Sequence, residues 1–476
     1  MSAAEIDGDI IRVLRSIDTS QHIGLFLGAG ASAASGLPDW DSFSINVLTD
    51  SGAIQDSVTA KAFLAGQDPA IVAEAAKEAA GDRWSAVLKS SLYGSEPVSP
   101  APLHYAAAVL AEHCGPDAIT LFTLNYDDLL EVALREVLDA KGKRVEVCSR
   151  QSQRPRARGG SYEVQHLHGF MPPGSSDAHS VILTLSDYNK LGENRSTWQS
   201  AALADSLSKG PLVLAGTSYR DPDVRQWIHD LAPRDEEPQV LVFLAREGLK
   251  LNRAQFEHVR AALERQWSAL GVRVIATHDY SDAAHALLEL PYIYQEDYRP
   301  PKDRAAILWE HHLENFAGQQ REDSEELEGD LQKLQELKPD VANLTLWLAN
   351  GDGELVRWSS HDRIYRHAEA LRRVRPGHDS DWIAAQCIGR NDFLVRDVPQ
   401  AGSTTRWLSV FAAPIGVRFD VGPQLPCGVI TAASVEPSEG EQLDEFVDAF
   451  SELSEKWALL LEMRTGIFAA PSGERG

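Results

Sequence analysis

A short run of small residues near the N-terminus has the composition of an anion-binding loop. The apolar residues Ile23 to Leu27 predict a buried strand, and Gly28-Ala29-Gly30-Ala31-Ser32 follows directly. Glycines in such a strand-to-helix turn let backbone N–H groups approach a pyrophosphate closely, and the N-terminus of the following helix favours the anion. The same composition can serve merely to pack a helix against a strand, so this loop by itself leaves both interpretations open.

Three later segments place polar side chains at the ends of strand-like runs. The segments are Thr123-Leu-Asn125-Tyr-Asp127 at the end of Ala118 to Leu124, Leu167-His168-Gly169 at the end of Glu163 to Leu167, and Gly216-Thr217-Ser218 after Leu212 to Ala215. Ligands of open α/β sheets bind outside the carboxyl ends of the parallel strands, so these residues should converge. Asn125 can orient an attacking water without becoming charged, and His168 can accept a proton near neutral pH.

Both residues also have a structural interpretation. Asn125 can cap a strand end or a turn, and His168 can be a satisfied core histidine beside the tight turn at Gly169. The position of His168 between the Asn and the Gly-Thr-Ser motifs favours a functional role for it. The Thr-x-Asn-x-Asp context favours the same for Asn125.

The elements that must position these residues alternate between strand and helix. Helical patterns cover much of 57–92, 104–113 and 129–138, and strand-like runs return at Val181 to Leu183, Val240 to Phe243 and Val272 to Ala276. This alternation predicts an α/β fold, a Rossmann-like doubly wound parallel sheet. We also expect a leading helix over Glu5 to Ile17 and a closing helix over Asp282 to Leu290.

In this order the motifs resemble those of the sirtuin superfamily, over about residues 20 to 285. The resemblance rests on the Gly-Ala-Gly-x-Ser loop, the turn Gly36-Leu-Pro-Asp39, Thr-x-Asn-x-Asp, His-Gly and Gly-Thr-Ser. Two further segments, Leu185-Ser-Asp-Tyr188 and Tyr219-Arg-Asp-Pro-Asp-Val-Arg225, are similar to the bacterial sirtuin-like branch of antiphage defence proteins.

The resemblance implies a site for NAD+. In it Asn125 holds the water and the ribose, His168 acts as base toward a ribose hydroxyl or water, and Asp127 organises the loop. The resemblance also implies which residues bind the other parts of NAD+. The phosphates would contact Gly28, Ala29, Gly30 and Ser32, and the adenosine side would contact Gly216, Thr217 and Ser218. Asp39 and Trp40 would cover the nicotinamide. Asp41 stands where deacylases usually carry an Arg, so their nicotinamide pocket is not copied in detail.

The absence of one sequence module indicates which molecule accepts the ADP-ribosyl group. Protein-deacylating sirtuins insert a four-cysteine zinc module between the His-Gly and Gly-Thr-Ser motifs, whereas Phe170 to Pro211 contains no cysteine. Tetrahedral zinc needs about four such ligands, so we expect no metal. Water is then the acceptor, which predicts an NAD+ glycohydrolase that depletes NAD+ in antiphage defence. The alternatives are an NAD-dependent protein deacylase or ADP-ribosyltransferase, and a non-catalytic NAD-binding regulatory module.

The composition changes after Pro300-Pro301. We expect a sirtuin-like domain over 1–298, a helical connector over 299–341, a smaller α+β domain over 342–467 and a disordered tail over 468–476. In the connector Leu327, Leu331, Leu334 and Leu337 form an apolar seam, which is either a docking face on its own domain or a dimer coil. The third region resembles a GAF sensory domain through Leu394-Val-Arg-Asp-Val398, Ser409-Val-Phe-Ala-Ala-Pro414 and Cys427-Gly-Val-Ile-Thr431.

The net charge and the cysteine content limit which partners and which cellular compartment we expect. The formal net charge of −25 argues against a sequence-independent grip on nucleic acid, and the basic run 150–158 is expected to be a solvated loop. Four cysteines without pairing or metal-ligand spacing suit a reducing compartment, and no signal or membrane-spanning segment is expected, so we predict a cytoplasmic protein. We further expect a homo-oligomer whose activity the GAF-like domain regulates, with a phage-derived or partner-protein trigger.

Overall fold

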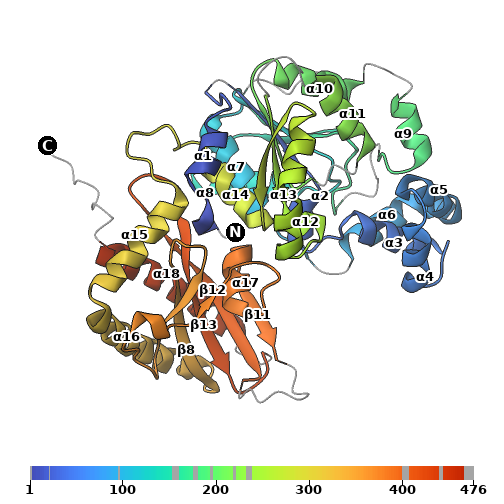
Figure 1. The fold of residues 1–476 in the computed structure, drawn as a ribbon. Helices are drawn as coiled ribbons and strands as arrows, with labels where there is room; N and C mark the ends of the chain where they lie inside the picture. The colour runs from blue at the N-terminus through green and yellow to red at the C-terminus, as the bar shows by residue number, and fades with distance from the viewer. Residues whose placement is uncertain are drawn as a thin grey trace. The chain divides into compact units, whose positions relative to one another are not determined.

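The chain forms two compact units. The computed structural model describes residues 3–20, 22–94, 97–152, 160–174, 181–192, 197–217, 221–231, 239–398, 407–438 and 443–465 (Figure 1). Ser16–Leu287 makes one unit, and Met1–Arg15 together with Leu288–Gly476 makes the other. The predicted tail over 468–476 lies outside the described residues, and among those that are described no helix is long and apolar enough to cross a membrane.

The first unit is built on a parallel sheet of seven strands in the order β3-β4-β2-β1-β5-β6-β7. The strands are β1 (Ile23–Leu27), β2 (Ile119–Thr123), β3 (Val147–Arg150), β4 (Tyr162–His166), β5 (Leu212–Ala215), β6 (Val240–Ala245) and β7 (Val272–Thr277). Every residue of β1, β2, β5 and β6 is buried, as expected for parallel strands that helices cover on both faces. The predicted Rossmann-like parallel sheet is confirmed.

Two details of the predicted strands are wrong. Val181 to Leu183 forms no strand; Leu183 is buried in a helical cluster and Val181 packs against it. The edge strand β3 was not expected, because Val147-Cys-Ser-Arg150 is half-buried and lacks an apolar run. Its pairing with β4, which the local sequence does not encode, makes it a strand.

Helices connect the strands of the first unit. They are α2 (Ala29–Ala34), α3 (Trp40–Ser51), α4 (Ser57–Ala65), α5 (Pro69–Ala80), the 3₁₀ turn η2 (Gly81–Arg83), α6 (Trp84–Tyr93), α7 (Pro102–Cys114), α8 (Leu129–Ala140), α9 (Leu185–Gly192), α10 (Trp198–Leu207), α11 (Pro222–Leu231), α12 (Arg246–Leu249), α13 (Arg253–Ser268) and α14 (Tyr280–Glu289). Helices α3 to α6 pack on one another around their own apolar core and gather beside α9 (Figure 1). This helical group begins at Asp39, whose carboxylate accepts from the Ser42 N–H and caps α3.

Two glycines allow the loops after β1 and β5 to touch. A Cβ on Gly28 would lie 2.7 Å from the Gly216 carbonyl oxygen, and Gly216 has a φ of +69°, in the left-handed region. The chain leaves β1 toward β2 on one side and later returns on its other side as β5. Such a switch point is where open α/β sheets form a crevice at their carboxyl edge.

The second unit contains an antiparallel sheet of six strands in the order β10-β9-β8-β13-β12-β11. The strands are β8 (Val341–Ala349), β9 (Leu355–Ser360), β10 (Arg373–Val374), β11 (Leu394–Asp397), β12 (Ser409–Val417) and β13 (Leu425–Ser434). The helices are η1 (Ala3–Glu5), α1 (Gly8–Leu14), α15 (Pro301–Glu314), α16 (Phe316–Leu337), η3 (Ala368–Ala370), α17 (Ile383–Arg390) and α18 (Leu443–Thr465). The predicted smaller α+β domain is therefore present.

The helices expected as a connector belong to this second core. Leu308 of α15 and Leu327, Leu331 and Leu334 of α16 are buried in the same cluster as Trp358 of the sheet. The leucine seam is thus a docking face on its own unit, and the alternative of a dimer coil is wrong for these buried side chains. The predicted leading helix is shorter than expected, because it divides into η1 and α1 around Asp7, which caps α1.

Candidate functional site

A cavity of about 450 Å³ opens at the carboxyl edge of the parallel sheet. The sequence-predicted residues on its wall are Gly28, Ala29, Gly30, Ser32, Asp39, Trp40, Asn125, Asp127, His168, Gly216 and Thr217. Ser218, the remaining predicted residue, lies outside the described part of the chain. Residues from the loops after β1, β2, β4 and β5 therefore meet around one space, and residues of α3, α5, α9 and α11 and of the segments after β6 and β7 also line it.

Asn125 is held rigidly, with one side-chain atom unused. Its Nδ2 donates to the Gly28 carbonyl at 3.1 Å and to Ser32 Oγ at 2.7 Å, which identifies this atom as the amide nitrogen. Its backbone N–H donates to Thr123 Oγ1 at 2.9 Å. The Asn125 Oδ1 atom is buried and has no hydrogen-bond partner among the described residues. A fixed, unsatisfied acceptor in a cavity wall is free to accept from a ligand or from water.

Asp127 ties the loops after β1 and β2 together. Ser32 Oγ donates to its Oδ2 at 2.7 Å, and the Leu129 N–H donates to its Oδ1 at 3.1 Å. Burial raises the pKa of Asp127, although the bond from Ser32 acts in the opposite direction. Since Asp127 bridges α2 and the start of α8, it can organise the loop that carries Asn125.

His166 supports the same loop from behind. Its ring nitrogens lie 3.0 Å from the Asn125 carbonyl oxygen and 2.7 Å from Glu131 Oε1, and both side chains of the His166–Glu131 pair are fully buried. Burial by itself lowers the pKa of His166, but Glu131 outweighs it and raises the pKa above its ordinary value. His166 therefore supports the loop that carries Asn125, whereas the His-Gly motif assigned the catalytic role to His168.

The phosphate contacts that the resemblance implies are partly engaged within the protein. The Gly28 N–H donates to the Ala215 carbonyl at 2.9 Å, and the Gly30 N–H donates to the Gly216 carbonyl at 2.7 Å. The Ser32 hydroxyl donates to Asp127 and accepts from Asn125. These groups join the two loops, so most of the implied phosphate donors already have partners.

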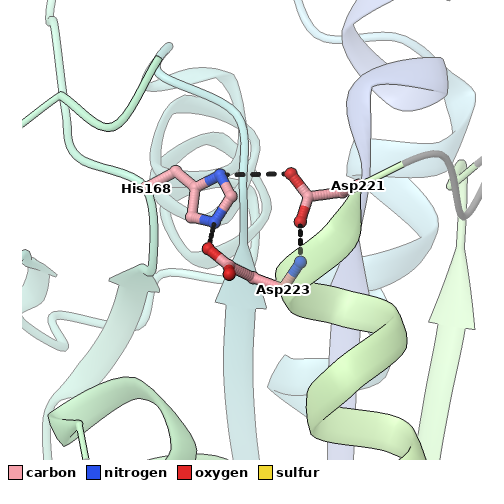
Figure 2. A group of neighbouring side chains, drawn as sticks. All are labelled: His168, Asp221 and Asp223. Carbon is pink, nitrogen blue, oxygen red and sulfur yellow. Dashed lines mark hydrogen bonds and ion pairs between the residues drawn. The ribbon is translucent and has the colours of Figure 1, made fainter. Parts of the chain in front are cut away.

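His168 lies between two carboxylates that the sequence analysis did not assign to the site (Figure 2). Its Nδ1 is 3.5 Å from Asp221 Oδ2, and its Nε2 is 3.3 Å from Asp223 Oδ2. Only 2% of the His168 side chain is exposed. Burial alone lowers the pKa of His168, but the two carboxylates overcome that effect and raise the pKa above its ordinary value. The two carboxylates therefore stabilise the protonated ring relative to the neutral one.

The same three side chains have ligand atoms within 4.8 Å of one another, close enough to hold a metal ion. However, each ring nitrogen of His168 faces a different carboxylate (Figure 2). One ion takes one imidazole nitrogen, whereas an imidazolium donates from both nitrogens, so the geometry fits an ion-paired histidine better than a metal centre.

Lys250 spans the cavity wall between two elements. Its Nζ lies 2.7 Å from Asp39 Oδ2 and 3.4 Å from Asp41 Oδ2, and its φ of +54° is uncommon for a residue with a side chain. Burial opposes ionisation of Asp39, but Lys250 and the α3 N-terminus lower its pKa. Tyr280 lines the wall between Gly30 and Gly248, since a Cβ on either glycine would meet its side chain at 2.4 Å or less. Only tertiary packing reveals these contacts, whereas Asp221 and Asp223 stand in a recognisable Asp-Pro-Asp segment.

Comparison with known proteins identifies a SIR2-like domain in the chain. The family model of that domain matches residues 119–275, which contain Asn125, His168 and Gly216. An NAD-dependent protein deacylase of Methylococcus capsulatus is 32% identical over 129 residues, which make up 25% of this chain and 41% of the relative. The chain thus spans about two fifths of the length of that relative. The predicted sirtuin-like character is confirmed for residues 119–275, and the loop 28–32 precedes the matched region.

Solved structures of GAF domains are similar to part of the chain. The GAF domain of A. aeolicus nlh2 in an inactive state has a TM-score of 0.24 and 18% identity, covering 34% of this chain and 97% of its own. The blue-light-absorbing PixJ GAF domain of Thermosynechococcus elongatus has a TM-score of 0.21 and 16% identity, covering 30% and 86%. Reduced fRMsr of Staphylococcus aureus has a TM-score of 0.20 and 15% identity, covering 33% and 92%.

Proposed function

We propose that the cavity binds NAD+ as a substrate and hydrolyses it to nicotinamide and ADP-ribose. The observation that carries this proposal is that Asn125, a residue of the cavity wall, has a buried Oδ1 with no hydrogen-bond partner among the described residues. A buried acceptor without a hydrogen bond costs about 1–3 kcal/mol, so a water or ligand hydroxyl is its natural partner. The SIR2-like match and the NAD-dependent relative support NAD+ as that ligand.

The charge of the cavity suits a reaction in which positive charge develops on the ribose. Six carboxylates line the described wall, from Asp39, Asp41, Asp68, Asp127, Asp221 and Glu247. Lys250 and Arg225 are the long cationic side chains there. Fixed negative charge in a partly closed site stabilises an oxocarbenium-like transition state. In this proposal the two cations bind the pyrophosphate, for which Lys250 exchanges its contacts with Asp39 and Asp41, because the amides of Gly28 and Gly30 already have partners.

In this proposal each residue has a role that depends on its position in the cavity. Asn125 orients the attacking water, and His168 receives its proton, both from the wall of the cavity. Asp39 and Trp40 cover the nicotinamide, while Gly216 and Thr217 hold the adenosine side.

Water is proposed as the acceptor because nothing in the sequence supplies the zinc module of protein deacylases. The segment Phe170 to Pro211 has no cysteine, and the cation-binding geometry at His168 is better explained by ion pairs. Purified protein should therefore contain far less than one zinc per chain by elemental analysis. A stoichiometric amount of zinc would favour the alternative of an NAD-dependent deacylase.

We further propose that the unit with the six-stranded sheet regulates this activity, in a cytoplasmic homo-oligomer that depletes NAD+ in antiphage defence. A constitutive NAD+ hydrolase would harm its own cell, and the second unit has its own core, separate from the cavity. Moving a mostly inactive population to a mostly active one needs about 5.5 kcal/mol of differential binding by the trigger. The fragment Ser16–Leu287 should then differ from the full chain in NAD+ cleavage or in oligomeric state. Equal values of both, with and without phage infection, would contradict regulation.

Separation of the products of NAD+ tests the proposed reaction. We expect nicotinamide and free ADP-ribose in equal amounts from the full-length protein. Isotope transferred from labelled NAD+ to protein would instead indicate an ADP-ribosyltransferase, and unchanged NAD+ would indicate a binding module. The activity is assigned to this cavity only if Asn125→Ala abolishes it.

A further inference from the structure

The ring of His168 is fixed in orientation by its surroundings. It packs edge-on against Tyr188 and Trp227, with ring centroids 5.6 and 5.9 Å away. Asp221 and Asp223 face its two nitrogens from the start of α11 (Figure 2). A buried ring clamped on its faces and at both nitrogens cannot turn to meet a substrate. The two carboxylates therefore decide which nitrogen carries a proton.

The two carboxylates have different surroundings. Asp221 lines the cavity, accepts from Tyr188 Oη at 3.0 Å, and caps α11 by accepting from the backbone N–H groups of Asp223 and Val224. Asp223 is not among the described residues of the cavity wall. Its buried Oδ2 and the buried Nε2 of His168 have no hydrogen bond within the described protein, and the two atoms lie 3.3 Å apart. Asp221 is thus engaged with Tyr188 and the N-terminus of α11, whereas the side chain of Asp223 contacts His168.

We propose that Asp223 is the positioning residue of His168: it holds a proton on Nε2, so that the lone pair of the neutral ring stays on Nδ1, the nitrogen facing the cavity-lining Asp221. This inference rests on the proposed hydrolysis of NAD+. An orienting carboxylate that fixes the tautomer of a catalytic histidine is an established device in acyl-transfer enzymes. Here the carboxylate comes from the first turn of α11, the helix after β5, and the histidine from the loop after β4 of a parallel sheet.

The proton balance of the reaction assigns each group one task. The water oxygen forms a bond to C1′ of the ribose, and the bond between C1′ and the nicotinamide nitrogen breaks with its electron pair going to nicotinamide. The water proton passes to Nδ1 of His168, and the resulting imidazolium is stabilised by Asp221 and Asp223. The proton then leaves to solvent, which restores the neutral ring.

This arrangement predicts a pH dependence. The groups facing the ring are Asp221 and Asp223 of α11 and Tyr188 of α9, and burial raises the pKa of Tyr188 far above its usual range, so this phenol stays neutral. Burial acts to lower the pKa of His168, and the two carboxylates together raise it. His168 must lose its proton before it can accept one from water, and this deprotonation occurs at a pH above the ordinary histidine range. Removal of the Asp223 charge should therefore shift the rise in hydrolysis to lower pH.

Nitrogen-15 NMR of the full chain, labelled at its histidine side chains, tests whether the proton lies on Nε2 of His168 without relying on activity. The His168 signals are assigned by their loss in His168→Gln. We expect a protonated Nε2 in the neutral ring of the wild type. In Asp223→Asn the pKa of His168 should fall by about 1 to 3 units, the size of shift that one adjacent opposite charge produces. An unchanged pKa, or a neutral ring protonated on Nδ1 in the wild type, would overturn the proposal.

Steady-state kinetics test whether Asp223 contributes to the hydrolysis of NAD+. In Asp223→Asn we expect kcat to fall about 100-fold, KM to stay within about twofold, and the pH at which activity rises to shift downward. Asp223→Glu, which keeps the charge, should recover part of kcat. Asp230→Asn is the matched control, because Asp230 is exposed on the same helix and contacts Gln226 and His229. Loss of activity in that control to the same extent would reveal a merely structural role of α11.

The two sets of measurements separate the two proposals. If the wild type forms no ADP-ribose, the proposed function fails, and the NMR result still decides whether Asp223 sets the protonation of His168. If the wild type is active and Asp223→Asn is equally active with the same pH profile, the positioning role fails and the proposed function stands.

Discussion

Two buried polar side chains, one from each unit, have opposite surroundings. In the second unit Asp323 accepts from Trp358 Nε1 at 2.7 Å and pairs with Arg464. In the first unit Asn125 lines the cavity, and its buried Oδ1 has no hydrogen-bond partner among the described residues. Burial of a polar group is costly unless it is hydrogen-bonded, so a satisfied cluster stabilises a fold, whereas an unsatisfied atom indicates a ligand.

A second acid of the six-stranded unit follows the same pattern. Asp330 accepts from Trp457 Nε1 at 3.1 Å and from Lys456 Nζ at 2.5 Å. Both Asp323 and Asp330 lie on α16 and pair with residues of α18, so they join two helices of one core. The comparison therefore assigns these acids to stability and Asn125 to chemistry, and substitutions can test that division.

The largest effect is expected at Asn125. Asn125→Ala should lower NAD+ cleavage by about 100- to 10,000-fold, the usual cost of losing one group that positions or transfers a proton. The variant also loses the bonds from Nδ2 to Gly28 and Ser32, worth about 1 kcal/mol each, so the protein should remain folded by circular dichroism. Near wild-type turnover would show that the site lies elsewhere.

The next effect concerns the paired acid. Asp323→Ala should lower the free energy of unfolding by about 3 kcal/mol, because it leaves the buried Trp358 Nε1 and the partly buried Arg464 without their acceptor. The measurement is urea unfolding, with Glu325→Ala as control, since Glu325 is exposed on the same helix. Equal stability of the two variants would contradict the structural role of the cluster.

A third prediction uses pH on a buried histidine of the first unit outside the cavity. His104 accepts from the Ala101 N–H at 3.1 Å, and burial lowers its pKa to about 4 from 6.5. The unfolded chain therefore binds a proton below pH 6.5 that the folded protein excludes until about pH 4. This contribution to stability is complete above pH 6.5 and is lost as the pH falls, by about 2 kcal/mol between pH 7 and pH 5.

The check is the pH dependence of urea unfolding in the wild type and in His104→Asn, which cannot titrate. The variant should show a smaller loss of stability over that interval. The same slope in both proteins would mean that another group controls it.

The smallest effect is expected at the exposed pair of the cavity wall. Lys250→Met removes the contacts to Asp39 and Asp41, and 63% of the Lys250 side chain is exposed. Exposed ion pairs contribute about 0–1 kcal/mol, so thermal unfolding should barely change. If Lys250 serves the pyrophosphate, KM for NAD+ should rise while stability does not. A drop in stability as large as that of Asp323→Ala would remove the distinction between the two units.

Much of the parallel sheet could be predicted because its strands are locally encoded. Leu212 to Ala215 is a continuous apolar run, and it forms β5 with those bounds. The segment Val181 to Leu183 is equally apolar but packs among helices, so an apolar run alone does not separate a strand from other buried structure. The edge strand β3 was missed for the opposite reason, since its residues are half-buried and only its partner β4 orders them.

The sequence by itself determined which loops meet. Asn125, His168 and Gly216 each follow a strand, and parallel strands bring their carboxyl ends to one edge. Only the tertiary structure decided which atoms of these residues are used. It engages the Gly30 amide with Gly216, leaves Asn125 Oδ1 without a partner among the described residues, and places Asp223 at the His168 ring. The physical reason is that strand order depends on hydrophobic patterns along the chain, whereas hydrogen bonds depend on distances of a few tenths of an ångström between segments far apart in sequence.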